Sequence, residues 1–71
     1  MPNDLTRNID PYQHLAIAEI LRPVMQIHAE ITIATAAVSK QDGVNNLMKI
    51  REHAQTALAQ CEAVMAEIVG V

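Results

Sequence analysis

The chain has 71 residues, and among them are no tryptophan, no phenylalanine, one tyrosine and one cysteine. A single cysteine cannot form an intrachain disulfide, so this is not one of the small domains held together by a disulfide framework. Without aromatic rings, a core has to be built from Ala, Ile, Val, Leu and Met. These small and aliphatic side chains are typical of packing between helices. The composition therefore predicts helix-on-helix packing.

Charge is also scarce: charged residues make up 18% of the chain, and the formal net charge is −3. The basic residues are scattered along the sequence: Arg7, Arg22, Lys40, Lys49 and Arg51. Nucleic-acid binding needs a clustered basic face, so it is not expected. The charge-free stretch near the middle, Ile31 to Ser39, is too short to span a membrane. The start of the chain lacks the pattern of a signal peptide, which predicts a cytoplasmic location.

Two apolar seams with alternating three- and four-residue spacing run through the sequence. The first consists of Ile17, Ile20, Val24, Ile27, Ile31, Ala34 and Val38. The second consists of Leu47, Ile50, Ala54, Ala57, Cys61, Val64 and Ile68. This spacing places each set on one face of a helix and allows such faces to interlock. The predicted fold is all-α, an antiparallel helical hairpin over residues 10–71 that follows an N-terminal tail over 1–9.

Local signals predict the helix boundaries. Asp10 followed by Pro11 is a typical helix start, because Asp caps free backbone N–H groups and Pro has no N–H to leave unpaired. The first helix is expected over about 11–40, a helix-breaking connection at Gln41–Gly43, and the second helix over about 44–69. A connection this short makes the two helices antiparallel neighbours.

Pro23 falls inside the expected first helix, where it removes one hydrogen bond and crowds the carbonyl four residues back. Either the helix is kinked near Ile20 to Pro23, or a short helix ends there and a longer one starts near Arg22. The spacing of the first seam continues through Pro23 without a slip, which favours one kinked helix.

A chain this short buries little surface alone and ordinarily needs a disulfide, a metal or self-association. Leu21, Leu58 and Met65 widen the two apolar stripes, which suits a four-helix core better than a two-helix seam. We therefore predict a homodimer of hairpins. In topology it is similar to helical-hairpin dimers such as plasmid copy-number RNA-binding bundles and antiactivator proteins. No motif is shared with them, so no residue role is carried over.

No pattern in the sequence predicts catalysis, a cofactor or a metal. His14 and His28 are about 21 Å apart along one helix, too far to share an ion, and the Glu-x-x-His pair of di-iron bundles is missing. The seam thiol of Cys61 has no base beside it on the same face, so we expect inert packing. The carboxylates, Glu30 among them, are expected on solvent faces.

Apolar residues remain outside the seams, and four of them follow one another at helical spacing: Met25, Ala29, Ile33 and Ala36. They are the candidate face for a partner, because an uncharged helix face is easily desolvated. The leading hypothesis is a non-enzymatic regulatory or adaptor protein that dimerises and docks onto a larger protein, for example as its inhibitor. The alternative is a purely structural oligomerisation module.

Overall fold

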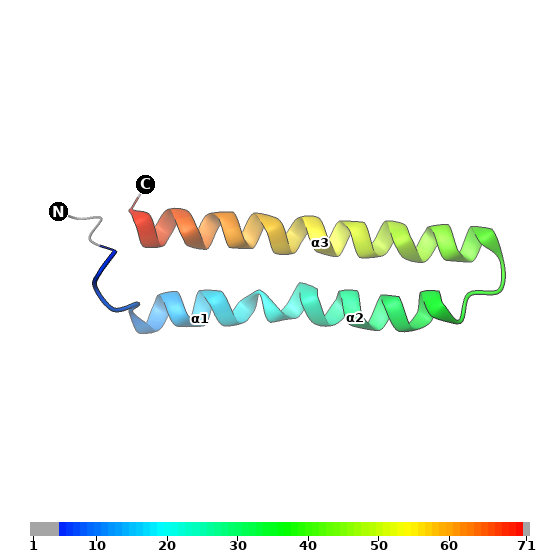
Figure 1. Cartoon of the computed structure of the whole chain (residues 1–71), viewed down its shortest axis with the longest axis horizontal. Helices are drawn as coiled ribbons and strands as arrows, with labels where there is room; N and C mark the ends of the chain where they lie inside the picture. The colour runs from blue at the N-terminus through cyan, green and yellow to red at the C-terminus, as the bar shows by residue number, and fades with distance from the viewer. Residues whose placement is uncertain (1–4, 71) are drawn as a thin grey trace.

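The structure, a computed structural model, describes residues 5–70, and over this range the chain is an all-helical hairpin (Figure 1). Helices α1 (Pro11–Glu19) and α2 (Leu21–Thr35) follow one another along one arm, and α3 (Lys40–Val69) forms the other arm. The arms run antiparallel, so α1 begins beside the point where α3 ends (Figure 1). The all-α prediction is confirmed for the described residues.

The start of α1 is a reciprocal cap. Asp10 Oδ1 accepts a hydrogen bond from the Gln13 N–H at 2.8 Å, and Gln13 Oε1 accepts one from the Asp10 N–H at 3.1 Å. Pro11 follows at the first helical position, as the Asp-Pro pair predicts. Of the expected tail, residues 5–9 contain a turn and no helix, while residues 1–4 lie outside the described range, as does residue 71.

The first arm is interrupted at one residue, Ile20, three residues before Pro23. Because Pro23 has no N–H, the carbonyl of Glu19 loses its helical donor. The helix is interrupted only at Ile20, whose φ of −64° and ψ of −21° remain helical. The Ile20 N–H bonds to the Ile17 carbonyl at 3.1 Å, and the Val24 N–H to the Ile20 carbonyl at 3.4 Å. The structure therefore has a one-residue interruption within the region Ile20 to Pro23 where the sequence predicts a kink or a break, and the backbone angles there remain helical.

The connection between the arms lies at Ala36–Ser39, so its predicted position at Gln41–Gly43 is wrong. Ser39 is the N-cap of α3, and its Oγ accepts a hydrogen bond from the Asp42 N–H at 3.0 Å. The Gly43 N–H donates to the Ser39 carbonyl at 3.1 Å. Gln41–Gly43 is thus part of the first helical turn, where a negative Asp42 interacts favourably with the helix dipole.

Both helix ranges shift as a result. The first arm ends at Thr35 and not near 40, and α3 begins at Lys40 and not near 44. The N–H groups of Ala36 and Ala37 bond three residues back, both at 3.1 Å, and these bonds tighten the final turn of α2. Val38, assigned to the first seam by its spacing, lies in the connection and is 99% exposed.

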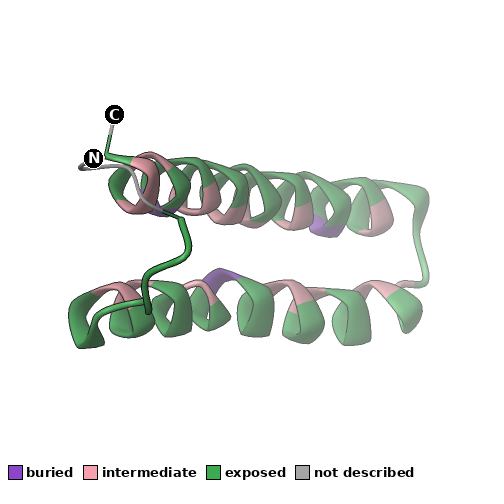
Figure 2. Ribbon diagram, turned by 60° about the vertical axis from the view of Figure 1, so that its left-hand side comes forward, coloured by how far each residue is buried: buried purple, intermediate pink, exposed green. Residues whose placement is uncertain are grey.

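The buried and half-buried residues recur at three- and four-residue spacing, on the sides of the two arms that face each other (Figure 2). On the first arm they are Gln13, Ala16, Ile20, Pro23, Ile27, Glu30, Ala34 and Ala37. On α3 they include Gly43, Asn46, Ile50, His53, Ala57, Gln60 and Val64. Within residues 5–70, Val64 is the one hydrophobic residue that ranks as core, at 9% exposed.

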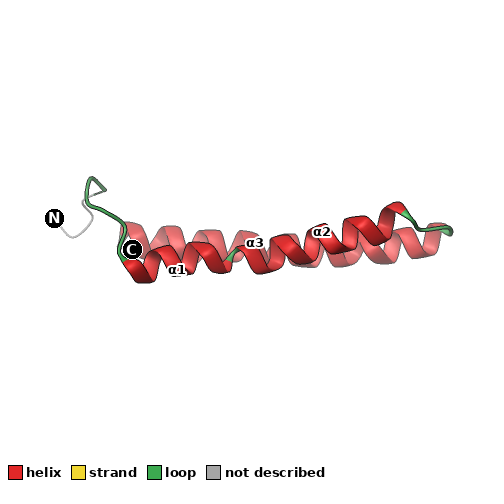
Figure 3. Cartoon of the chain, turned by 90° about the horizontal axis from the view of Figure 1, so that it is seen from below, coloured by secondary structure: helices red, strands yellow, loops and turns green. Residues whose placement is uncertain are grey.

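The hairpin is one layer of helices, about as thick as a single helix. Its extents are 56 × 18 × 14 Å, and in the view from below the two arms overlie one another (Figure 3). A single layer has two broad faces, and the arm contact lies between them. The chemistry of these two faces therefore decides what the hairpin can do.

Gly43→Ala is predicted to raise the free energy of unfolding by about 0.5–1 kcal/mol, because an interior helical glycine costs backbone entropy that alanine does not. Nothing lies within 4 Å of a Cβ added at Gly43. Urea denaturation followed by circular dichroism measures the change. The control is Gly70→Ala, which should destabilise by about 1–2 kcal/mol because φ is 83° there. If Gly43→Ala destabilised the protein, that result would contradict a helical conformation at Gly43 and would favour the connection that the sequence predicts there.

Candidate interaction surface

The hairpin buries only alternate members of the first apolar seam. Ile20, Ile27 and Ala34 face α3 and are half-buried. The members between them, Ile17, Val24 and Ile31, are 41%, 45% and 51% exposed. These three side chains do not take part in the arm contact, although the spacing groups all six on one stripe.

The second seam is divided in the same way. Ile50, Ala57 and Val64 face the first arm. Leu47 is 60% exposed, and Ala54 is also exposed. Cys61 and Ile68 are half-buried at the edge of the contact. The prediction that Ile27 and Ile31 lie against the small residues Ala54, Ala57 and Cys61 is wrong. Ile31 is 51% exposed, and Ile27 lies level with Ile50, one turn beyond the Glu30–Asn46 bond.

Polar residues occupy the remaining contact positions. Glu30, expected on a solvent face, is half-buried and accepts a hydrogen bond from Asn46 Nδ2 at 3.3 Å. Asn46 is only 9% exposed. Gln60 is half-buried too, and its Oε1 is buried with no hydrogen-bond partner in the structure. The contact therefore has an apolar side and a polar side.

Sequence reasoning did not single out these polar residues. One feature of the sequence could have identified them: each stands four residues before a member of an apolar seam and so lies on the border of that seam. The residues are Glu30, Asn46, His53 and Gln60. Periodicity alone gives the centre of a stripe, and it does not say which flank meets the neighbouring helix.

The exposed halves of the two seams lie on the same broad face of the hairpin. Each exposed member follows a contact position by four residues, which moves it about 51° round the helix, one heptad position. In an antiparallel pair, equivalent heptad positions of the two helices lie on the same side of the contact. We call this surface the apolar face; its members are Ile17, Val24, Ile31, Leu47, Ala54, Cys61 and Ile68.

More apolar side chains border the apolar face. Leu21, Leu58, Met65 and Val44 are 58%, 59%, 58% and 50% exposed. In the described part of the chain, the same borders also carry His14, His28, Thr35 and Arg51. The apolar face is thus continuous over several helical turns, with its polar groups confined to the margins.

The opposite face, which we call the polar face, has a different composition. Heptad geometry assigns to it Tyr12, Glu19, Gln26 and Ile33 from the first arm and Lys49, Thr56 and Ala63 from α3. Glu19 Oε2 pairs with Arg22 Nε at 3.3 Å, and both side chains are at least half exposed. An ion pair this exposed adds little stability. The hairpin is consequently amphipathic across its thickness.

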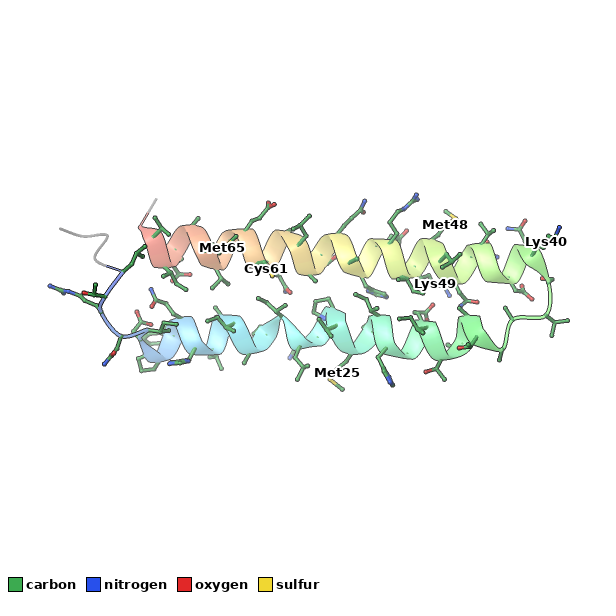
Figure 4. All side chains as sticks on the ribbon, viewed as in Figure 1. Met25, Lys40, Met48, Lys49, Cys61 and Met65 are labelled. Carbon is green, nitrogen blue, oxygen red and sulfur yellow. The ribbon has the colours of Figure 1, made fainter. Side chains whose placement is uncertain are left out.

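The candidate partner residues Met25, Ala29, Ile33 and Ala36 are all exposed. Met25 projects from the side of α2 that points away from α3 (Figure 4). Ile33 and Ala36 line an open hollow near the connection. The other residues that line this hollow are Ala37, Val38, Asp42, Asn45, Asn46 and Lys49. The structure therefore brings two of the four candidates beside polar groups of α3.

The titratable side chains do not gather into a site. Within residues 5–70, no three His, Cys, Asp or Glu side chains are close enough to hold a metal ion. His53, by contrast with the exposed His14 and His28, is half-buried in the arm contact. In the same range, no helix combines the length and the hydrophobicity that crossing a membrane requires.

The chain matches no protein-family model, no curated protein and no solved structure. What it does has to be inferred from its own surfaces. The most distinctive of these is the apolar face, because large aliphatic side chains are concentrated there beside an almost coreless hairpin.

Asn46→Ala is predicted to lower the free energy of unfolding by about 1 kcal/mol, because the half-buried Glu30 carboxylate loses its hydrogen-bond donor. Thermal denaturation at neutral pH measures the loss. Asn45→Ala is the control, since Asn45 bonds to Gln41 on the exposed surface, and it should change stability by only a few tenths of a kcal/mol. Equal effects of the two substitutions would contradict a structural role for the Glu30–Asn46 bond.

Proposed function

We propose that this protein is a small, non-enzymatic cytoplasmic adaptor that acts as a homodimer. Two hairpins pack apolar face against apolar face and form a four-helix bundle, with one core shared by both chains. The observation that carries this proposal is the direction of the apolar seams. Each seam is directed partly at the neighbouring arm and partly out of the hairpin, toward the apolar face.

The direction of the seams agrees with the geometry of a four-helix bundle. In a square bundle, the core lies about 45° from the line that joins neighbouring helices. The midline of each seam is turned about 51°, one heptad position, from the midline of the arm contact. A self-sufficient two-helix coiled coil would instead have its seams directed at one another. Each arm is therefore oriented as a bundle helix would be.

The apolar face is also large enough for a stable interface. The hairpin measures 56 by 18 Å across this face, a footprint of about 1,000 Å², compared with about 800 Å² buried by each partner in a standard stable complex. Covering the exposed parts of Ile17, Val24, Ile31 and Leu47 would bury apolar surface at about 25 cal/mol per Å². A second copy supplies a matching apolar surface, since a two-fold interface uses the same patch on both chains.

Dimerisation through the apolar face leaves the candidate partner residues uncovered. Met25, Ala29, Ile33 and Ala36 lie on the outer side of α2 or toward the polar face. We propose that a larger protein docks there, with its function inhibited or redirected by the dimer. The hollow beside Ile33 and Ala36 supports this role, because an apolar floor rimmed by Asp42 and Lys49 offers both burial and orientation. The alternative is a module that only holds chains together.

Ile31→Lys should weaken self-association at least about a hundredfold, because an unpaired charge would be buried in the shared core at a cost of several kcal/mol. Ile33→Lys is a closely matched control, since the two isoleucines are 51% and 53% exposed on the same helix but belong to different faces. Ile33→Lys should leave the dimer intact. Sedimentation velocity over a concentration series measures both variants; equal behaviour of the two would contradict use of the apolar face.

The docking role predicts a separate effect of Ile33→Lys. A partner isolated with the wild-type dimer should bind the Ile33→Lys dimer at least about tenfold more weakly, because a charge on the docking face is costly to desolvate. Titration calorimetry with the purified partner measures this. Thr56→Lys, on the polar face of α3, is the control and should bind normally. Unchanged binding by Ile33→Lys would favour the purely structural module.

A further inference from the structure

We propose that the second copy binds the apolar face with its connection at the same end of the bundle. The two-fold axis then runs parallel to the helices, and the first arm of each chain packs against α3 of the other. This inference rests on the proposed dimer and adds its orientation. The alternative is a perpendicular axis, which would place the connections at opposite ends and each arm against its own copy.

The level of a residue is its position along the long axis of the hairpin. The levels of residues on the two arms can be matched from two fixed points. The bond between Asn46 and Glu30 sets one level, and the start of α1 beside the end of α3 sets the other (Figure 1). Between these points, Leu21 is level with Leu58 to within one helical turn. By the same count, Val24 is level with Ala54, and Ile17 with Cys61.

Same-end packing places large side chains against small ones at two levels of the apolar face, although at a third level Ile31 meets Leu47 of the partner subunit, and both are large. Rotation about an axis parallel to the helices keeps every residue at its own level. Val24 then meets Ala54 of the partner subunit, and Ile17 meets Cys61 of the partner subunit. These pairings occur twice and keep the spacing of the helices similar on both sides of the bundle. Interdigitation of large and small residues is the condition for a core without voids.

Opposite-end packing places the large side chains of the first arms against one another, although Leu47 then meets Cys61 of the partner subunit. A perpendicular axis inverts the levels, so Val24 meets its own copy and Ile17 meets Ile31 of the partner subunit. On the other side of the bundle, Ala54 meets its own copy. The first arms of the two chains are then held apart by β-branched side chains. Either a gap remains between the two α3 helices, or these helices approach one another more closely than the first arms do. Both departures reduce packing density.

Two residues on the borders of the apolar face, Leu21 and Leu58, favour the same orientation. In same-end packing, the exposed Leu21 lies opposite Leu58 of the partner subunit, so two apolar side chains cover one another. In opposite-end packing, Leu21 would lie opposite His28, and Leu58 opposite Arg51. A leucine beside a basic group either stays exposed to water or removes water from part of that group. Removing water from a basic group is costly. Same-end packing avoids this choice for Leu21 and Leu58, although it places His14 opposite Met65 of the partner subunit and His28 opposite Arg51 of the partner subunit.

Distances between spin labels near the connection test this orientation. A spin label is attached to Lys40→Cys in a Cys61→Ala background. The distance between the labels of the two chains is measured by pulsed electron–electron double resonance. Same-end packing predicts label separations of about 15–30 Å, the width of a four-helix bundle plus the label linkers. Opposite-end packing predicts more than about 40 Å, since each label would then lie at a different end of helices about 45 Å long.

Glu67→Cys in the same background is the matched control, because it reports on the other end of the bundle. Short separations for both labels support the proposal, and long separations for both overturn it while leaving the dimer in place. Sedimentation of each labelled protein is recorded in parallel. A helical monomer would overturn the dimer as well, and would mean that something other than a second copy covers the apolar face.

As a second readout, the triple variant with Leu21→Cys, Leu58→Cys and Cys61→Ala should oxidise to a covalent dimer. Residues 21 and 58 point away from each other within one hairpin, so a disulfide between them has to join two chains. Ala54→Cys with Cys61→Ala is the counterpart, and it should cross-link only in opposite-end packing. Covalent dimer from the second variant and not the first would overturn the proposal.

Discussion

The exposed apolar half-seams are the constraint on which the rest of this structure depends. Folding has to offset a conformational entropy of roughly 1–2 kcal/mol per residue, and burial of apolar surface makes the largest favourable contribution against it. In the described hairpin, Val64 is the only hydrophobic residue that ranks as core, whereas Ile31 and Leu47 remain more than half exposed. The proposed core shared with a second chain would give these side chains the burial that one layer of helices cannot.

The polar residues of the arm contact fit the same arrangement. Glu30, Asn46 and Gln60 lie on the flank of the contact that turns away from the apolar face. The Asn46–Glu30 bond ties the arms together at one level. A polar pair at one position of a helical seam favours one alignment over its neighbours, because a shifted alignment leaves both groups unpaired. The apolar face, by contrast, has no charged side chain among its members that would have to be desolvated when a second hairpin packs against it.

The helix start and the interruption of the first arm could be predicted from the sequence because their causes are local. Asp10 and Gln13 cap one another within a single turn, and Pro23 removes one identified hydrogen bond. The connection was misplaced because Gly43 was interpreted as a helix breaker. A glycine can stand within a helix at a modest cost, and the cap at Ser39 determined where α3 begins.

The arm contact could be predicted only in part, for a reason that lies outside any one helix. Heptad spacing groups apolar residues on one stripe of each helix, but it does not say which flank of that stripe meets the neighbouring arm. Ile20 and Ile27 face α3, while Ile17 and Val24, on the same stripe, do not. The candidate partner face was predicted as exposed, and Met25 and Ile33 are exposed because they lie far from the stripe's centre.

The most direct test of this account is the mass of the unmodified protein in solution. Light scattering coupled to size exclusion, at micromolar concentration, should give about twice the chain mass of 7.8 kDa, because only a second hairpin of the same kind covers the apolar face symmetrically. Circular dichroism on the same sample establishes that the protein is helical. A well-folded helical monomer would contradict the account, since its aliphatic half-seams would then remain in water without a partner.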